Sequence, residues 1–293
     1  MSRLLLIDGH AYAYRAFYAI RELRGPDGAA TNAVYGFIKM LEKMRSVVNP
    51  THLMVVWDGG LAVQRLELLP GYKAQRPEMP ADLRSQIDAI QDYLAAEKVP
   101  GYCADGVEAD DYIGTLAIKA AAWGWQVVIA SADKDFMQLV TGQVGLLNPN
   151  DKEPRIWGRD EVVAKTGVNP DQVIDWLALM GDSVDNIPGV AGVGPKTAAN
   201  LLAQFGSVAG IYGRLTEVKS AKMQAALAGA QAAVERNLKL VKLHPVECLC
   251  EPADLMPGAP DVDKKRSLFS QWGFKGMLAA LPPMFAMKQE ELI

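Results

Sequence analysis

Three short apolar runs, each ending in aspartate, constrain the fold of this chain more than any other feature. A continuous run of Leu, Val and Ile is typical of a strand buried on both faces of a parallel sheet. Helical segments separate the runs, and this alternation predicts a parallel α/β sheet with right-handed crossovers. The runs cover residues 3–8, 52–58 and 125–133, and the expected helices cover residues 31–48, 81–96 and 110–123.

Aspartates stand at the carboxyl ends of these three strands, at Asp8, Asp58 and Asp133. Parallel strands end along one edge of a sheet, and ligands of open α/β sheets bind at that edge. One aspartate after a strand is usually a helix cap or a turn residue. Three strands ending in the same way, with Asp135 two residues further on, favour a shared acidic site instead.

The stretch GVEADD places Glu108, Asp110 and Asp111 immediately before an apolar helix. Like charges this close repel, and no cation stands beside them in the sequence to neutralise them. A helix dipole stabilises an acidic residue at its N-terminus by under about 1 kcal/mol, which accounts for one or two of the three. Clustered carboxylates are the ligands of hard divalent cations. Two ions about 3.5–4 Å apart are the arrangement used for phosphoryl displacement.

A glycine-rich loop further along the chain has the sequence GVAGVGPKTA, with Gly189, Gly192 and Gly194 before Pro195. Proline at the first helical position marks a helix start. Backbone amides at the start of such a helix can hold a phosphate, with Lys196 beside them. A simple tight turn is the alternative. Two more acids, Asp182 and Asp185, precede this loop.

The segment of residues 69–84, LPGYKAQRPEMPADLR, combines prolines, one aromatic side chain and several cations. This composition predicts a mobile connection outside the core. Tyr72 could stack on a base, and Lys73 and Arg76 could meet phosphates. A solvated surface loop without function is the alternative.

Composition limits the class of protein. The chain has 293 residues, half of them hydrophobic, with a net charge of −4. No signal peptide or membrane span is expected. Cys103, Cys248 and Cys250 lack zinc-site spacing and predict free thiols in a reducing, cytoplasmic compartment. If nine acids bind metal, the 34 acidic residues leave 25 against 30 basic ones, so the negative net charge does not oppose nucleic-acid binding.

Five blocks of sequence together resemble the 5′-nuclease (flap endonuclease) superfamily, in particular the N-terminal 5′–3′ exonuclease domain of bacterial DNA polymerase I. They are LLLIDGHAYAYRAFYA with AVYGF, VVWDGG…R…GYKAQRPEMP, GVEADDYIGTLA, ASADKDFMQLV and LMGDSVDNIPGVAGVGPKTAANLL. The blocks cover nearly the whole chain in the order of the family. Trp57 stands where the family commonly has Phe, and LAVQRLELL replaces a more polar stretch.

This resemblance implies roles for individual residues. It implies a first metal group of Asp8, Asp58, Glu108, Asp110 and Asp111, and a second of Asp133, Asp135, Asp182 and Asp185. It implies Mg²⁺ as the ion, with Mn²⁺ as a substitute, and catalytic roles for Lys73 and Arg76. The implied DNA contacts are Arg15, Phe17, Tyr72, Lys73, Arg76, Gly192, Gly194, Lys196 and Thr197. Backbone carbonyls of Val190 and Val193 would hold K⁺.

The implied activity is hydrolysis of DNA phosphodiesters near 5′ ends or at 5′ flaps by two metal ions, in replication and repair. The partners would be DNA, including RNA-primed DNA, and a DNA polymerase that is fused or acts in trans. A monomer associated with the bacterial nucleoid is expected. We expect a PIN-like α/β nuclease core over residues 1–175, with a mostly parallel sheet flanked by helices. A helix–three-turn–helix DNA-binding region would follow over residues 176–255, and an extension packing on the core over residues 256–293.

Three other functions are compatible with parts of the pattern. A ribonuclease of the PIN type also has an Asp-edged sheet, but those domains are much smaller and lack the glycine loop. A non-catalytic protein that binds DNA junctions would need the loop and not nine acids. A phosphatase with an aspartate nucleophile would need a second Asp two residues after Asp8, where this chain has His10.

Overall fold

The apolar runs form strands in the computed structural model, which describes residues 2–283. By internal contacts the chain divides into two units. The first unit comprises Ser2–Trp57, Met79–Tyr102 and the chain from Cys250 onward, and the second comprises Asp58–Glu78 and Cys103–Leu249. The expected C-terminal extension ends in residues 284–293, which lie outside the described residues.

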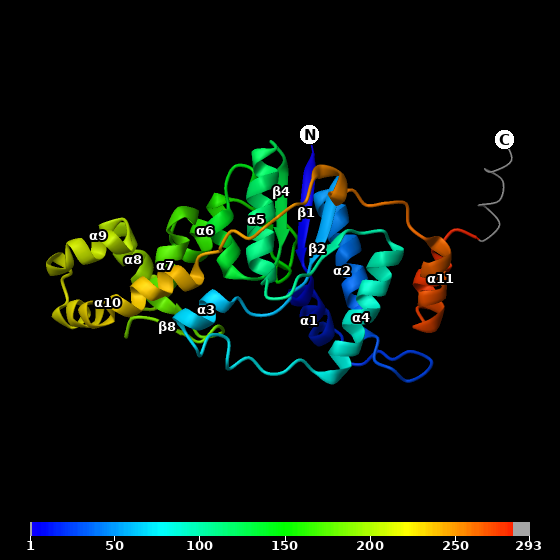
Figure 1. The fold of residues 1–293 in the computed structure, drawn as a ribbon, viewed down its shortest axis with the longest axis horizontal. Coiled ribbons are helices and arrows are strands. Elements are labelled where there is room, and N and C mark those ends of the chain that lie inside the picture. Colours follow the sequence, from blue (N-terminus) through cyan, green and yellow to red (C-terminus); the bar gives the residue numbers. More distant parts are fainter. Residues whose placement is uncertain (1, 284–293) are drawn as a thin grey trace. The chain divides into compact units, whose positions relative to one another are not determined.

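The first unit contains three parallel strands in the order β3-β2-β1, which are β1 (Arg3–Asp8), β2 (His52–Val56) and β3 (Gly101–Tyr102). β1 and β2 pair with Leu4 opposite His52. The helices of this unit are α1 (Gly9–Ala19), α2 (Asn32–Val48), α4 (Ala81–Ala96), α11 (Val262–Gln271) and α12 (Lys275–Ala279), with a 3-10 turn at Pro252–Leu255. α2 and α4 lie side by side (Figure 1).

The core of the first unit consists of the apolar residues of β1 and β2 and the inner faces of the helices. Leu4, Leu5, Leu6 and Ile7 are all fully buried, as expected for a strand covered on both faces. Asp8 then ends the strand, and its Oδ1 accepts a hydrogen bond from the Ala11 amide at 3.0 Å. The carboxylate therefore caps α1, which is the common role of aspartate after a strand.

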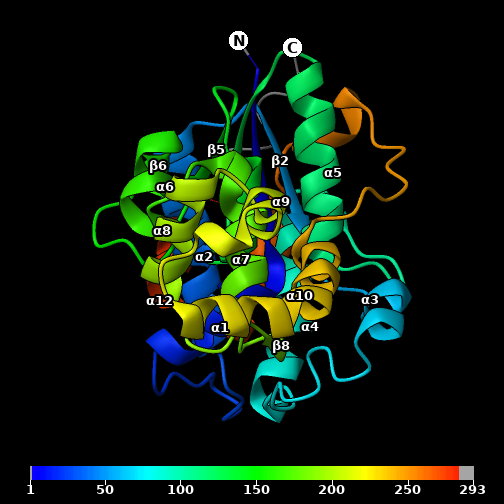
Figure 2. The same cartoon turned by 90° about the vertical axis from the view of Figure 1, so that its left-hand side faces the viewer.

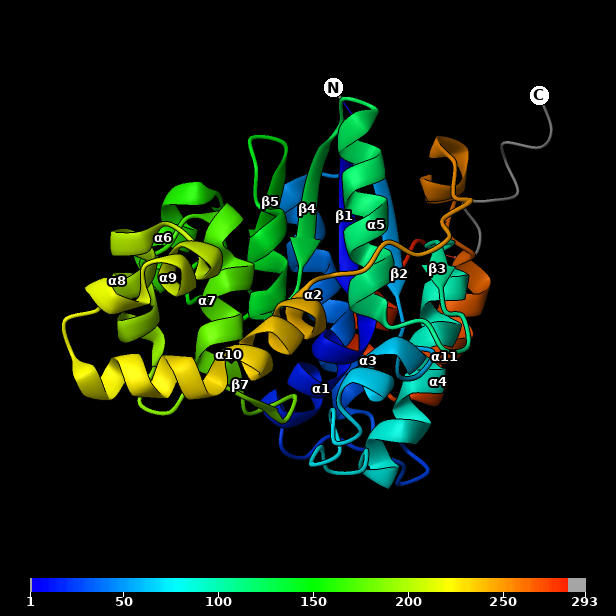
Figure 3. The ribbon, with the colours of Figure 1, turned by 60° about the vertical axis from the view of Figure 1, so that its left-hand side comes forward.

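The second unit contains β4 (Gln126–Ala130), β5 (Val144–Leu147) and β6 (Ile156–Trp157), in that order. β4 and β5 run parallel, side by side (Figure 3), with Val127 opposite Val144, and β6 is antiparallel to β5. Helices α3 (Val63–Leu68), α5 (Ala109–Ala122) and α6 (Arg159–Thr166) belong to this unit, with a 3-10 helix at Lys134–Leu139.

The remaining part of the second unit is mainly helical (Figure 2). It consists of α7 (Val173–Met180), the short hairpin strands β7 (Gly181–Asp182) and β8 (Ile187–Pro188), α8 (Pro195–Phe205), α9 (Val208–Gly213) and α10 (Ala221–Val241), with 3-10 turns at Pro170–Gln172 and Leu215–Glu217. α10 packs on α7, and Asn237, which is fully buried, donates to the Ala178 and Pro188 carbonyls. This side chain ties α10 to the C-terminal part of α7 and to the hairpin.

The predicted strands and helices are confirmed to within a few residues. The helix expected over residues 81–96 is α4 with the same bounds, and those expected over 31–48 and 110–123 are α2 and α5. The last strand is shorter than predicted, because the chain leaves β4 at Ala130 and turns through Ser131 before Asp133. Within residues 2–283, no helix is long and apolar enough to cross a bilayer.

Candidate metal centre

The acidic residues that the sequence singled out between Asp58 and Asp185 all lie in the second unit. Asp58 is exposed, and its Oδ1 accepts a hydrogen bond from the Ala109 amide at 2.9 Å, in the first turn of α5. The chain after Asp58 approaches another backbone closely. A Cβ atom built on Gly59 would lie 1.8 Å from the Ala104 carbonyl oxygen. Only glycine fits here without a shift of the backbone.

Glu108 stands at the N-cap of α5 and is 1% exposed. Its Oε1 accepts from the Ala62 amide at 3.0 Å, and its Oε2 is in contact with Lys73 Nζ and 3.3 Å from the Tyr72 hydroxyl. Burial raises the pKa of Glu108, but the charges of Lys73 and Arg65 lower it further than burial raises it. The net pKa lies below the ordinary value, so Glu108 is ionised at neutral pH.

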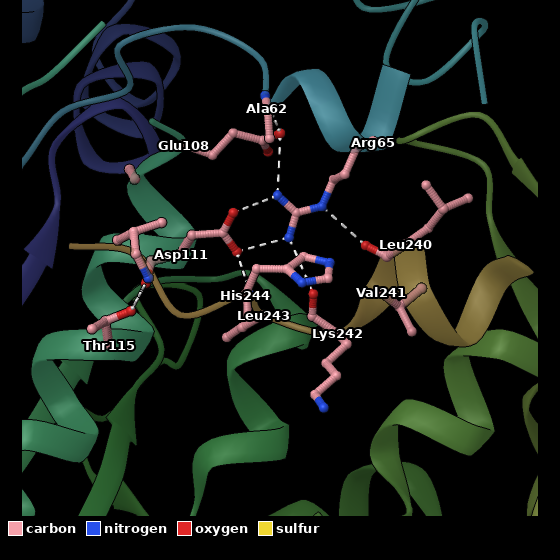
Figure 4. A network of polar contacts seen from close by, with 12 residues as sticks. Ala62, Arg65, Glu108, Asp111, Thr115, Leu240, Val241, Lys242, Leu243 and His244 are labelled. Atoms are coloured by element: carbon pink, nitrogen blue, oxygen red, sulfur yellow. Dashed lines mark hydrogen bonds and ion pairs between the residues drawn. The ribbon is translucent and has the colours of Figure 1, made fainter. Parts of the chain in front are cut away.

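Asp111, in the first turn of α5, is held by both oxygens (Figure 4). Arg65 Nη1 lies 2.6 Å from Oδ2 and Arg65 Nη2 lies 2.8 Å from Oδ1, which is a bidentate ion pair. The His244 amide donates to Oδ1 at 2.8 Å. Burial lowers the pKa of Arg65, but its bonds to Asp111 and the charge of Glu108 raise it above the usual value.

No cation stands beside the GVEADD acids in the sequence, yet cations from a distant segment neutralise two of them. Arg65 neutralises Asp111, and Lys73 neutralises Glu108. Both cations come from the stretch 59–78, which is distant from α5 in the sequence. Asp110 lies on the same turn of α5. Burial lowers the pKa of Lys73, but the charges of Glu108 and Asp110 raise it above its usual value.

A second group of acids consists of four aspartates on two turns, namely Asp133, Asp135, Asp182 and Asp185. Desolvation raises the pKa of Asp135 well above its ordinary value, and the charges of the other three raise it further. The pKa of Asp133 is raised in the same way, first by desolvation. Asp182 pairs with Lys134 at 3.1 Å and Asp185 with Arg76 at 2.6 Å, so each of these two aspartates has a cation beside it.

Asp135 has a carboxylate oxygen that no other group stabilises by a hydrogen bond within the described residues. Its Oδ1 atom is buried and has no hydrogen-bond partner among the described residues. An unpartnered buried oxygen costs free energy, about 1–3 kcal/mol and more for a charged group. A divalent cation with oxygen ligands would relieve both this cost and the mutual repulsion. The chemistry of the donors therefore fits a hard cation, although within residues 2–283 no three acidic, His or Cys side chains already converge as a ligand set.

Tyr72, Lys73 and Arg76 join the two acidic groups. The Tyr72 hydroxyl lies 3.3 Å from Glu108 Oε2 and 3.4 Å from Asp185 Oδ2, and the Lys73 amide donates to the Asp185 carbonyl at 3.0 Å. Lys73 adopts the left-handed conformation, with φ of 55°, which a residue other than glycine rarely does.

The prediction that this connection lies outside the core is thus wrong for its central residues, since Tyr72 is 4% and Lys73 7% exposed. In this arrangement a base cannot reach the Tyr72 ring unless the ring moves.

The glycine loop precedes α8, which begins at Pro195 as predicted. Gly192 has φ of 79°, a backbone conformation that favours glycine. Lys196 is exposed, whereas the side chains of Val190 and Val193 are buried. The two predicted first-helix residues lie in the first unit. Arg15 and Phe17 are both partly buried on α1, and the Phe17 carbonyl accepts from Asn32.

Lys134, which pairs with Asp182, is one site residue that sequence reasoning missed, and Arg65 is another. It lies in LAVQRLELL, which differs from the family and which we connected with secondary contacts only. The structure forms α3 there and buries Arg65 to 3% exposure. A single cation within an apolar stretch is a signal that could have drawn attention to it, because an arginine is almost never fully buried unless paired.

Two family models match consecutive parts of the chain. The 5′–3′ exonuclease N-terminal resolvase-like domain matches residues 3–167, and the 5′–3′ exonuclease C-terminal SAM fold matches residues 168–266. Together they support the predicted fold class, a PIN-like α/β part followed by a helical part. The first match includes Arg65, Asp111, Asp133 and Asp135. The second match includes Asp182, Asp185, α8 and α10.

Two curated relatives and one solved structure illustrate the similarity. The 5′–3′ exonuclease of Aquifex aeolicus is 36% identical over 286 residues, covering 97% of each chain. DNA polymerase I of Pseudomonas aeruginosa is 41% identical over 285 residues, covering 94% of this chain and 31% of that protein. The chain thus spans about a third of the polymerase and almost all of the exonuclease.

The solved structure is the flap endonuclease of bacteriophage T5, in a pseudo-enzyme-product complex with DNA and metal ions. It is 26% identical with a TM-score of 0.68, covering 82% of this chain and 89% of that one. The resemblance inferred from the five sequence blocks is therefore confirmed. The chain belongs to the 5′–3′ exonuclease family.

Proposed function

We propose that the chain is a metal-dependent, structure-specific 5′-nuclease that hydrolyses DNA phosphodiesters at 5′ ends and at 5′ flaps. The observation that carries this proposal is the group of four aspartates in which Asp135 has an unpartnered buried oxygen and a raised pKa. Two acidic groups joined by Lys73 and Arg76 provide places for cations and positive charge for a phosphate. The metal ions and DNA in the T5 relative's structure support the same assignment.

The proposed ligands form two sets within the second unit. Asp58, Glu108 and Asp110 would supply one, and Asp133, Asp135, Asp182 and Asp185 the other. Asp111 is left out because Arg65 and the His244 amide hold both of its oxygens. Asp8, in the first unit, stays a prediction from the sequence. Bound Mg²⁺ or Mn²⁺ would supply an acidified water and charge stabilisation for phosphate displacement.

The cations of this chain would act on the phosphate directly. Lys73 and Arg76 neutralise Glu108 and Asp185, and Arg76 keeps 42% of its side-chain surface exposed. Its guanidinium can therefore form hydrogen bonds with a phosphate oxygen without leaving the site. Preorganised donors of this kind stabilise charge that develops during displacement.

The DNA grip is assigned to the glycine loop and the start of α8. Amides at the N-terminus of α8, with Lys196 and Thr197, would hold a phosphate of the duplex. Carbonyls of Val190 and Val193 would hold K⁺, and Arg15 and Phe17 would contact DNA. Tyr72 would contact DNA only after its ring moves. The substrates would include RNA-primed 5′ ends, with a polymerase fused or in trans. We retain the monomeric state, the nucleoid location and the domain boundaries near residues 175 and 255 as parts of the proposal.

Cleavage of a labelled 5′-flap duplex with and without Mg²⁺ tests this function. The proposal predicts Mg²⁺-dependent products at the base of the flap from the wild type and their loss in Asp135→Asn. Single-stranded RNA of the same length is the control. Preferred cleavage of the RNA would favour a PIN-type ribonuclease, and tight flap binding without any Mg²⁺-dependent cleavage would favour a junction-binding protein. Either outcome would contradict the proposal.

A further inference from the structure

The ion pair between Arg65 and Asp111 connects the ends of two helices. Asp111 lies in the first turn of α5, where the helix dipole favours a negative charge. Arg65 Nε donates to the Leu240 carbonyl at 3.1 Å and Nη2 to the Lys242 carbonyl at 3.2 Å, at the C-terminal end of α10. The last carbonyls of a helix have no partner within it, and a cation there is favourable. One guanidinium therefore caps α10 and anchors α5 (Figure 4).

Further polar contacts hold the chain that follows α10 to the same place. The His244 amide donates to Asp111 Oδ1 at 2.8 Å, and the Val246 amide donates to Thr115 Oγ1 at 3.0 Å, one turn further along α5. Gln138 binds the same segment from the other side, donating to the Val241 carbonyl at 3.0 Å and accepting from the Leu243 amide at 3.1 Å. We call Arg65, Asp111, Thr115 and Gln138 the helix joint, since each fixes backbone groups of residues 240–246.

The helix joint uses nearly all of the acceptor capacity of Asp111. Two carboxylate oxygens offer about four lone-pair positions. Oδ1 accepts two hydrogen bonds and Oδ2 accepts one, all at 2.8 Å or less. A divalent ion at the remaining position would lie against the guanidinium of Arg65, which cannot lose its proton. Glu108 has as many contacts, with the Ala62 amide, Arg65, Lys73 and Tyr72. It differs because Arg65 does not bind it in a bidentate pair and lies 3.3 Å away, while Lys73 and Tyr72 end in groups that can rotate.

We propose that Asp111 is a positioning residue and not a metal ligand, and that the helix joint fixes α10 relative to the start of α5. The joint connects the part of the chain matched by the resolvase-like model to the part matched by the SAM-fold model. This inference rests on the proposed function, since α8 and its glycine loop would hold the duplex while the acids lie near the cut. The helix joint then sets the distance between the duplex-binding loop before α8 and the acidic residues that would hold the metal ions. This distance determines which phosphodiester is hydrolysed.

Metal affinity separates Asp111 from its neighbour Asp110. In Mn²⁺ titrations followed by electron paramagnetic resonance, Asp110→Asn should weaken binding by about tenfold or more, while Asp111→Asn stays within about threefold of wild type. Hydrogen exchange gives the opposite ranking. The His244 amide should exchange about tenfold or more faster in Asp111→Asn and stay protected in Asp110→Asn. Equal loss of Mn²⁺ affinity in the two variants, or an unchanged His244 amide in Asp111→Asn, would overturn the proposal.

Cut position tests the positioning role itself. Arg65→Met should spread the products of a 5′-flap duplex over neighbouring phosphodiesters, and Arg65→Lys should restore part of the wild-type distribution. Arg155→Met, at an exposed arginine, is the matched control and should keep the wild-type cut. An unshifted cut in a folded Arg65→Met would overturn the role. If wild type cleaves no flap substrate, the proposed function fails by itself, and the Mn²⁺ and exchange measurements still decide the role of Asp111.

Discussion

Arg76 Nη2 lies 2.6 Å from Asp185 Oδ1, so a cation from the segment before α4 neutralises one of the four aspartates of the second acidic group. The same group of aspartates includes two whose pKa is raised by desolvation and by their neighbours' charges. Positive charge and excess negative charge thus stand next to each other. That arrangement suits a site that must hold cations and bind a phosphate.

Replacement of Arg76 should affect rate far more than stability. We expect Arg76→Ala to lower kcat on a 5′-flap substrate by about 10²–10³-fold, the usual effect of removing one preorganised charge donor. The melting temperature should fall little, because a pair with an exposed partner contributes about 0–1 kcal/mol. Arg84→Ala, at an exposed arginine in α4, is the control and should keep both rate and stability. A rate for Arg76→Ala within threefold of the control would remove Arg76 from the phosphate contacts.

The raised pKa of Asp135 makes the metal-free protein more stable in mild acid. Its folded-state pKa lies above the unfolded value of about 3.9, so the folded protein binds more protons in the interval between them. Stability in EDTA should therefore fall as the pH rises through that interval. Thermal melts of wild type and Asp135→Asn across the interval measure this effect. The melting temperature of the wild type should fall with rising pH relative to that of the variant. Parallel curves would show that folding does not raise the pKa of Asp135.

The close approach at Gly59 should make this position intolerant of any side chain. A Cβ atom there would lie 1.8 Å from the Ala104 carbonyl oxygen, and backbone on both sides must shift. Overpacking of this kind costs about 1–3 kcal/mol of unfolding free energy. Chemical denaturation of Gly59→Ala should show that loss. Gly142→Ala is the control, since a Cβ atom there meets no atom within 4 Å. An equal midpoint for the two variants would contradict the packing described here.

Local patterns predicted much of this fold and less of its site. The buried strand Leu4–Ile7 and the helix α4 follow from apolar runs and helical periodicity, which depend on neighbouring residues. The two-residue strands β3 and β6 have no such pattern and form only by pairing with longer strands. The acidic residues were identifiable because their spacing is local and because the family motifs contain them.

The partners of those acids were not predictable from local sequence. Arg65 reaches Asp111 across 46 positions and the Leu240 carbonyl across 175. No periodicity encodes contacts at that separation. Tyr72 was placed outside the core because its segment is rich in proline. Its ring is instead buried, and its hydroxyl contacts Glu108 and Asp185. Tertiary hydrogen bonds decided both cases.

Anomalous diffraction from crystals grown with Mn²⁺ would show which carboxylates bind the ion. We expect a peak within about 2.5 Å of carboxylate oxygens of the Asp133, Asp135, Asp182 and Asp185 group. We expect no peak on Asp111, which should keep Arg65 and the His244 amide as partners. Absence of any ion from the four aspartates would rule out the proposed metal site, and an ion bound to Asp111 in place of Arg65 would rule out the positioning role.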